Sequence, residues 1–300
     1  MAASNDSKWR SAATMVFDRP IEARRNVAMF GLSTYQTSVS PRSSTSTPQA
    51  IRAALERFST WSWASRVDLA EYVAIVDHGD VEDPDGDGAR ERLAAMLEGV
   101  DAPLTMFLGG DNATTWHAMG AFAGERLDEF GLITLDAHLD MRDGRSNGSP
   151  VRQLLDEGLD PRHVVQVGLG EYSNSAAYAR DSLKRGVRII ERDAFHREDV
   201  AVIARRALEV ARQGGRKVYV DIDLDVADRS VAPGCPASVP GGLSADEVRR
   251  FVREITSSPH VTAIDFTEVD VEQDAPDERT VRLAALLVLE ALLGVQRRLL

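Results

Sequence analysis

Short runs of apolar residues rich in Val, Ile and Leu alternate along the chain with longer segments in which apolar residues recur at helical spacing. The short runs predict eight strands, over residues 26–31, 72–76, 104–108, 132–135, 164–168, 187–190, 218–224 and 261–266. The longer segments predict eight helices, over residues 48–58, 88–97, 114–125, 150–157, 176–184, 200–212, 245–255 and 280–298. Strands separated by helices cannot be neighbours in tight hairpins, so we expect a mainly parallel sheet with helices on both faces. The predicted fold is α/β, a three-layer α/β/α domain with a sheet of about eight strands.

Three short segments refine this pattern. Ser244 and Glu247 have the spacing of a capping box at the start of a helix. Residues 34–47 are rich in Ser and Thr and follow the first predicted strand, where they form either a lid over a site or a plain surface connection. Residues 81–88 read VEDPDGDG, but Glu91 is wrongly spaced for the closing ligand of an EF-hand calcium loop, so a solvated turn is expected.

Acidic residues two positions apart follow two of the predicted strands. Asp136, His138 and Asp140 follow one strand, and Asp223 and Asp225 lie at the end of another. Side chains in extended chain alternate between faces, so each set projects to one side. Four carboxylates crowded at the carboxyl end of a sheet would repel one another unless divalent cations neutralised them. The spacing therefore predicts a metal site at this edge.

Composition narrows the class of protein. The 300 residues are 43% hydrophobic and 27% charged, and no repeat or linker divides them, so we expect one domain over 1–300 with an irregular extension over 1–25. The net charge of −12 disfavours nucleic acids and anionic membranes as partners. The sequence shows no apolar run of membrane-spanning length and no signal peptide, and its single cysteine, Cys235, excludes an internal disulfide. A cytoplasmic protein that binds a small molecule is expected.

Several familiar motifs are incomplete. Gly168 and Gly170 follow a strand, but Ser173 stands where a dinucleotide fingerprint needs its third glycine. The chain has neither a G-x-S-x-G elbow nor a phosphate-binding P-loop, which leaves serine hydrolases and P-loop NTPases without support. The isolated histidines are expected to be surface or capping residues: His78, His117, His163, His196 and His260.

The chain contains six longer motifs: FLGGDNATT at 107–115, LDAHLDMRD at 135–143, SNGSP at 146–150, VDIDLDVAD at 220–228, VPGGLS at 239–244 and FTEVDVEQD at 266–274. They occur in the order found in the ureohydrolase superfamily of arginase and agmatinase, which the chain resembles from about residue 48 to its end. Within that superfamily, GGDN in place of GGDH, NG in place of HG before Ser149, and the runs EYSNSAAY and APGCPA most resemble the formimidoylglutamases of histidine degradation.

The resemblance implies two Mn²⁺ ions bridged by a hydroxide that attacks the formimidoyl carbon of N-formimidoyl-L-glutamate, giving L-glutamate and formamide. The ligands of the first ion would be Asn112, Asp136, Asp140 and Asp223. Those of the second would be Asp136, His138, Asp223 and Asp225. Oxygen donors with a single imidazole also favour Mn²⁺ over Zn²⁺ on chemical grounds. Asn112 is a neutral, weaker donor, and a structural hydrogen bond from the GGD turn is the alternative for it.

The same resemblance assigns roles around the metals. Asp140 would accept the hydrogen bond of the attacking hydroxide, and Glu268 would hold the amidine nitrogens of the substrate. Asn147 stands where arginases carry a histidine thought to move protons, and because asparagine does not titrate, proton delivery is left to Asp140, to water or to the substrate. Arg142 follows the DAHLD motif and suits the carboxylate of an acidic substrate.

Substrate contacts and the reaction class carry further expectations. Ser173 and Asn174 align with the family's substrate loop, whereas Gly170 stands where relatives commonly have an arginine; Arg145 and Arg152 are weaker candidates for binding a carboxylate. One alternative function is another ureohydrolase, acting on agmatine, hydroxyarginine or a guanidino acid and releasing urea. A zinc deacetylase of related fold and a non-catalytic binding protein are remote alternatives. Relatives are often trimers or hexamers, so a homo-oligomer is expected.

Overall fold

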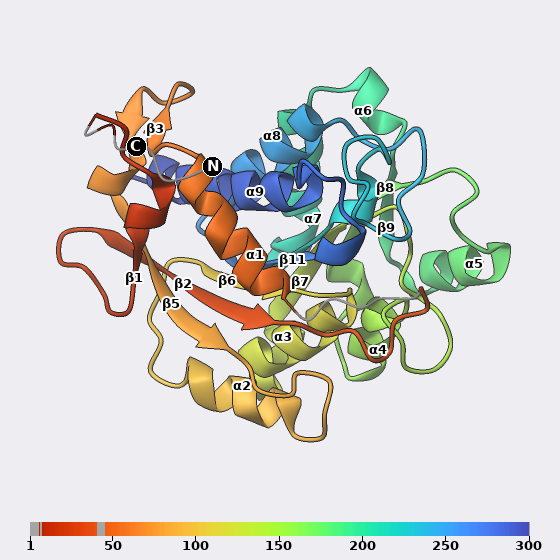
Figure 1. The fold of residues 1–300 in the computed structure, drawn as a ribbon. Coiled ribbons are helices and arrows are strands. Elements are labelled where there is room, and N and C mark those ends of the chain that lie inside the picture. The colour runs from red at the N-terminus through yellow and green to blue at the C-terminus, as the bar shows by residue number, and fades with distance from the viewer. Residues whose placement is uncertain (1–5, 7, 41–45, 300) are drawn as a thin grey trace.

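The computed structural model describes residues 6, 8–40 and 46–299. Within them, nine strands form an entirely parallel sheet in the order β1-β5-β2-β6-β11-β10-β7-β8-β9 (Figure 1). The strands are β1 (Val16–Phe17), β2 (Arg25–Leu32), β5 (Val73–Asp80), β6 (Thr105–Gly109), β7 (Phe130–Leu135), β8 (Val164–Leu169), β9 (Arg188–Glu191), β10 (Lys217–Asp223) and β11 (Val261–Thr267).

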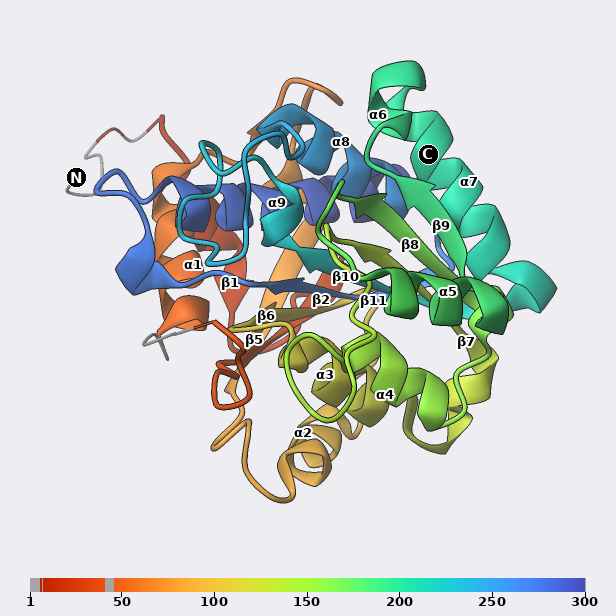
Figure 2. The same ribbon diagram turned by 90° about the vertical axis from the view of Figure 1, so that its right-hand side faces the viewer.

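Helices cover both faces of this sheet and give the three layers seen in Figure 2. One apolar core lies between the sheet and α1 (Thr47–Ala54), α7 (Val200–Ala211), α8 (Ala245–Thr256) and α9 (Arg279–Arg297). The other core lies under α2 (Ala89–Leu97), α3 (Ala113–Ala123) and α4 (Pro150–Asp156), with the start of α5 (Ala176–Arg185) packed beside it. The short α6 (Ala194–Arg197) precedes α7. This three-layer arrangement confirms the predicted fold class.

All eight predicted strands and all eight predicted helices are present, with ends that differ by a few residues. The predicted capping box of α8 is also formed, with Ser244 and Glu247 satisfying each other's backbone N–H groups. Strand β1 and the small antiparallel pair β3 (Trp61–Ser62) and β4 (Val67–Asp68) were not predicted. Two residues are too few to show a period, so elements this short leave no readable pattern.

The sheet carries buried polar side chains on the face that leads to the site. Asp221 of β10 lies level with Thr134 of β7 and Asp265 of β11, and all three are fully buried. Beside them, the Tyr219 hydroxyl donates to Asp265 Oδ2 over 2.7 Å. Polar groups this deep need partners, so the polar face of these strands extends the site into the sheet.

No helix in the described part of the chain combines the length and the apolar character that crossing a membrane requires.

Candidate metal centre

The predicted acidic residues meet at the carboxyl ends of three adjacent strands, β11, β10 and β7. A cavity of about 290 Å³ opens there, and its wall includes His138, Asp140, Asp223, Asp225 and Glu268. Asp223 is the last residue of β10, and the loops after β7, β10 and β11 supply the other four side chains, as expected for a parallel sheet, whose strands end together at one edge. The structure thus brings together residues that are far apart in the sequence.

One cluster of metal-ligating atoms, here called the outer site, consists of Asp136, His138 and Asp225. One ligand atom from each of the three lies within 4.8 Å of the other two. His138 Nδ1 is 2.9 Å from Asp225 Oδ2 and 3.5 Å from Asp136 Oδ1. The His138 backbone N–H also donates to Asp136 Oδ1 over 2.7 Å, which fixes that carboxylate against the loop.

A second cluster, here called the deep site, consists of Asp136, Asp140 and Asp221, again with one oxygen from each within 4.8 Å of the others. Asp136 belongs to both clusters, so its carboxylate lies between two positions that could each hold a cation. Asp221 was not among the predicted site residues. Its signal was nevertheless present, because Asp221, Asp223 and Asp225 form one run of alternating acids in VDIDLD.

Buried oxygens without partners show that these residues fit divalent cations. Asp136 Oδ2 and Asp225 Oδ1 are buried and accept no hydrogen bond from any described residue. Burial and the Asp225 carboxylate raise the pKa of Asp136. Burial opposes protonation of His138, but the Asp225 and Asp136 carboxylates outweigh it and raise the pKa of His138 to about 12. Cations would relieve this repulsion and displace that proton.

The donor set selects the kind of cation. The two clusters consist of carboxylate oxygens and one imidazole, and the single cysteine does not belong to them. Hard oxygen ligands suit Mg²⁺ and Mn²⁺, and an imidazole ligand favours Mn²⁺ of these two. Asp223, a predicted bridging ligand, lines the cavity, and its Oδ1 accepts from the Asp225 N–H over 2.8 Å. Its role as a ligand stays a prediction.

Two carboxylates of the site are held on strained backbone. Asp140 has a φ of 52° and Glu268 a φ of 60°, both in the left-handed region that residues other than glycine seldom adopt. The Glu268 N–H donates to the Gly110 carbonyl over 2.8 Å, which helps to hold this conformation. Such strain persists only where the surrounding structure enforces it, and it is common at functional sites. Here it turns both side chains toward the cavity.

Asn147 holds Glu268 in place. Its Nδ2 donates to Glu268 Oε1 over 2.9 Å, and its Oδ1 accepts from the Val39 N–H over 2.9 Å. Glu268 Oε1 also accepts from the Asn112 N–H at the start of α3, over 2.9 Å. With both ends of its amide engaged, Asn147 positions the carboxylate of Glu268. It also ties the loop after β2 to the site.

Part of the predicted lid or surface segment lies outside the described residues, namely 41–45. Of the described part, Val39 and Ser40 line the cavity, and the Thr37 carbonyl accepts from the Asn147 N–H over 3.2 Å. This portion of the loop therefore forms a wall of the site. The other irregular segment, 81–88, contains only turns and bends.

Asn112, a predicted ligand, lies beside the deep site with its amide nitrogen facing the acids. Nδ2 donates to Asp140 Oδ2 over 2.5 Å. On the other side, Asn112 Oδ1 accepts from the hydroxyls of Thr115 over 2.8 Å and Thr267 over 3.0 Å. This arrangement matches the structural hydrogen bond that was the alternative to ligation. The ligand role of Asn112 stays a prediction.

The predicted substrate contacts all line the cavity, but they differ in whether their polar groups are already engaged by the protein. Arg142, Ser173 and Asn174 line the cavity, together with Tyr178 of α5, which was not predicted. No described carboxylate forms an ion pair with Arg142, so its guanidinium can meet a ligand. Asn174, by contrast, holds the metal-binding loop: its Nδ2 donates to the Ala137 carbonyl over 3.0 Å and its Oδ1 accepts from the Leu139 N–H over 2.8 Å.

The two weaker arginine candidates are engaged elsewhere. Arg145 stacks on Trp116, with its guanidinium carbon 4.7 Å from the ring centroid, and contacts His117 Nε2 over 3.3 Å. Arg152 pairs with Asp181 over 3.2 Å and donates from Nε to the Met141 carbonyl over 2.9 Å. Neither lines the cavity. The contacts of both arginines stabilise the loop after β7, and neither guanidinium is placed to bind a ligand in the cavity.

Comparison with known proteins places these features in a family. A family model described as the arginase family matches residues 25–294. A formimidoylglutamase of Bacillus subtilis is 32% identical over 283 residues, which cover 90% of this chain and 87% of that protein. The proclavaminate amidinohydrolase of Streptomyces clavuligerus is 36% identical over 176 residues, which cover 56% of this chain and 54% of that protein.

Solved structures show the same likeness. The crystal structure of formimidoylglutamase from Bacillus subtilis matches with a TM-score of 0.88 and 30% identity, covering 98% of this chain and 94% of that one. A Trypanosoma cruzi formiminoglutamase solved with Mn²⁺ matches with a TM-score of 0.85 over 96% of this chain and 99% of that one. At 21% identity, this second likeness concerns the fold.

Proposed function

This chain belongs to the arginase family, and we propose that it is a hydrolase of linear amidine C–N bonds that converts N-formimidoyl-L-glutamate to L-glutamate and formamide. The observation that carries the proposal is the pair of acidic clusters sharing Asp136, in a chain similar over 90% of its length to a formimidoylglutamase. The urea-releasing alternatives are less favoured, because three relatives that match 83 to 90% of this chain bear the formimidoylglutamase name.

Two Mn²⁺ ions are the proposed cofactor, as in the Trypanosoma cruzi formiminoglutamase. His138 and Asp225 would hold the ion of the outer site, Asp140 that of the deep site, and Asp136 and Asp223 would serve both. When bound, a pair of such cations lowers the pKa of a shared water so that a nucleophile is available near neutral pH.

Asp140 is proposed to orient the nucleophile and carry its proton. Its carboxylate lines the cavity, while Asn112 Nδ2 holds one of its oxygens. Burial and the neighbouring Asp136 carboxylate raise the pKa of Asp140 while no cation is bound. In the metal-loaded enzyme, a carboxylate beside the attacking water can accept its proton and pass it to the departing nitrogen.

Glu268 is proposed to bind the amidine end of the substrate. Two N–H groups, from Asn112 and Asn147, hold Oε1 and fix the plane of the carboxylate at the cavity wall. A carboxylate pairs well with a delocalised amidinium, in which two nitrogens share the positive charge. Because Asn147 is engaged at both ends of its amide, its contribution to catalysis is to position Glu268.

Arg142 and Ser173 are proposed to bind the glutamate part of the substrate. Both line the cavity, and Arg142 is free of ion pairs with described residues. A guanidinium at this position attracts a substrate with carboxylates and repels cationic agmatine. A homo-oligomer and a cytoplasmic location stay predictions.

The first test is a substrate panel with the Mn²⁺-loaded protein. We expect formamide and glutamate from N-formimidoyl-L-glutamate, and at least about 100-fold lower kcat/KM for urea release from agmatine, guanidinobutyrate and arginine, because those substrates lack the matching carboxylates or formimidoyl group. Formamide and urea are measured separately, and a sample stripped by chelator serves as the control. Urea release alone would overturn the substrate assignment. Turnover of no amidine, with less than one Mn²⁺ bound per chain, would favour the non-catalytic alternative.

Replacing Asn112 by histidine should tighten binding of the deep-site ion. An imidazole is a stronger ligand than an amide, whose oxygen is here engaged by Thr115 and Thr267. We expect a gain of about 10-fold or more in Mn²⁺ affinity at that site. Isothermal titration calorimetry measures it, with the unaltered protein as the reference. Unchanged affinity in Asn112→His would show that position 112 does not reach the ion.

A further inference from the structure

We propose that Asp221 is a ligand of the deep-site cation and supplies the donor that this chain lacks at Asn112. This proposal rests on the proposed function, because it concerns one ion of the same metal pair. It adds a residue that lies inside the sheet, below the wall of the cavity.

The position of Asp221 follows from strand register. On β10 it precedes Asp223 by two residues, so both side chains project from the same face. Asp221 lies level with Thr134 of β7, two residues before Asp136. Its carboxylate therefore lies two residues further from the carboxyl end of the sheet than those of Asp136 and Asp223. It faces the cluster from the interior of the sheet.

Asp221 offers its oxygens to the deep site. Both of its carboxylate oxygens are fully buried, and neither accepts a hydrogen bond from a described residue. Asp136 Oδ2 is likewise buried and without a hydrogen-bond partner among these residues. Native proteins seldom leave buried polar atoms unsatisfied, so two carboxylates in this state at one place indicate a ligand between them.

The spacing of the oxygens suits a small divalent cation. One oxygen from each of Asp136, Asp140 and Asp221 lies within 4.8 Å of the others. Oxygens that share an octahedral ion of about 2.1 Å bond length are separated by about 3 to 4.2 Å. A small closing movement of the side chains around a bound ion would bring the three oxygens into this range.

The Asp265 carboxyl group is the alternative partner of Asp221, because the two side chains lie within hydrogen-bond reach of each other. In the described part of the chain, no Lys, Arg or His forms an ion pair with Asp221 or Asp140. Asp265, the neighbour of Asp221 on β11, already accepts the Tyr219 hydroxyl over 2.7 Å. The competing arrangement is a proton shared between Asp221 and Asp265, which would leave the deep site with one ligand fewer.

Asn112 makes the extra ligand necessary. Its amide oxygen accepts from Thr115 and Thr267, and its nitrogen donates to Asp140. In this orientation the amide offers no lone pair to the deep site. The Asp221 carboxylate, on the interior side of the deep site, replaces the missing donor. A site made of hard oxygen ligands is strongly selective for ions that prefer oxygen.

The test compares Mn²⁺ binding in variants. Asp221→Asn keeps the shape but provides a weaker donor, and Asp221→Ser removes the carboxylate altogether. We expect both to bind the deep-site ion at least about 100-fold more weakly and to retain close to one Mn²⁺ per chain, held by the outer site. Calorimetry gives the two affinities, elemental analysis gives the metal content, and electron paramagnetic resonance should lose the coupled-pair signal.

Asp77→Asn is the matched control, because it alters a carboxylate of β5 that pairs with Arg52 outside both clusters, and it should keep both ions within about 3-fold of their affinities. The double variant Asn112→His/Asp221→Asn should recover the deep-site ion through the new imidazole. Two tightly bound ions with unchanged affinity in either Asp221 variant would overturn the proposal in favour of the shared proton. Failure of the unaltered protein to bind Mn²⁺ or to hydrolyse an amidine would instead contradict the proposed function.

Discussion

Replacing Asp136 by asparagine should remove both metal ions and lower kcat/KM on N-formimidoyl-L-glutamate by at least about 10⁴-fold, equivalent to about 5.5 kcal/mol of transition-state stabilisation. Asp136 belongs to both the outer and the deep site. Its loss therefore weakens both cation positions, whereas loss of His138 weakens one. Steady-state kinetics and metal content after gel filtration measure the two effects.

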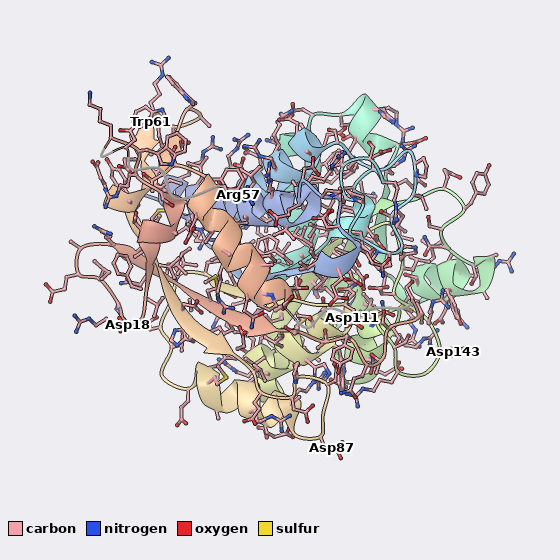
Figure 3. All side chains as sticks on the ribbon, viewed as in Figure 1. Asp18, Arg57, Trp61, Asp87, Asp111 and Asp143 are labelled. Carbon is pink, nitrogen blue, oxygen red and sulfur yellow. The ribbon has the colours of Figure 1, made fainter. Side chains whose placement is uncertain are left out.

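Asp143→Asn is the matched control for this variant. Asp143 lies in the same sequence motif as Asp136, but its side chain is 82% exposed. Figure 3 shows it at the periphery of the molecule, far from the interior position of Asp111, which is fully buried. Its replacement should change kcat/KM by less than about 3-fold, since surface substitutions away from a site have small effects. Metal content of two ions per chain in Asp136→Asn would show that Asp136 does not bridge the sites.

Glu268→Gln should lower kcat/KM by about 100-fold or more while leaving both ions bound. Glutamine keeps the size of the side chain and an oxygen that the N–H groups of Asn112 and Asn147 can still reach. It loses the negative charge that pairs with the amidinium, and the loss of one partner of a buried charge pair costs about 3 kcal/mol. Kinetics and metal analysis on the same sample separate substrate binding from metal binding.

Glu278→Gln controls for the unusual backbone at Glu268. Glu278 also has a left-handed conformation, with a φ of 56°, but it pairs with Arg57 away from the cavity. This change should leave kcat/KM within about 2-fold, since exposed ion pairs contribute little. A fall in metal content of Glu268→Gln would reassign Glu268 as a ligand, and unchanged kinetics would remove it from the substrate site.

Much of the architecture could be predicted from the sequence. The eight principal strands are apolar runs bounded by turns, and this pattern is local, so it can be read without knowing the partners of each strand. The capping box at Ser244 and Glu247 was also readable, because both residues act within one helical turn. The two-residue strands β1, β3 and β4 were not, since their pairing depends on segments distant in the chain.

The site was predictable to the level of its chemistry. Alternating acids after two strands predicted a cation site, and the structure brings Asp136, His138 and Asp225 into one cluster. The detailed roles required three dimensions. Asn174 lines the cavity, and both ends of its amide hold the backbone of the metal-binding loop, so its contact with the substrate stays a prediction. The sequence cannot tell an asparagine that binds substrate from one that holds a loop. The two roles are distinguished only by the groups that surround the side chain in the folded protein.

The sequence by itself determined the strands, the helices and the acid-rich edge that demands cations, because residue spacing along one segment decides which side chains share a face. The tertiary structure decided which acids meet. Asp221 joins Asp136 and Asp140 because of the register between β10 and β7, and Asn112 turns its oxygen away because of threonines from α3 and β11. These arrangements depend on the packing of segments that are distant in the sequence. That packing decides which atoms come within hydrogen-bond distance, and the spacing of residues within one segment does not reveal it.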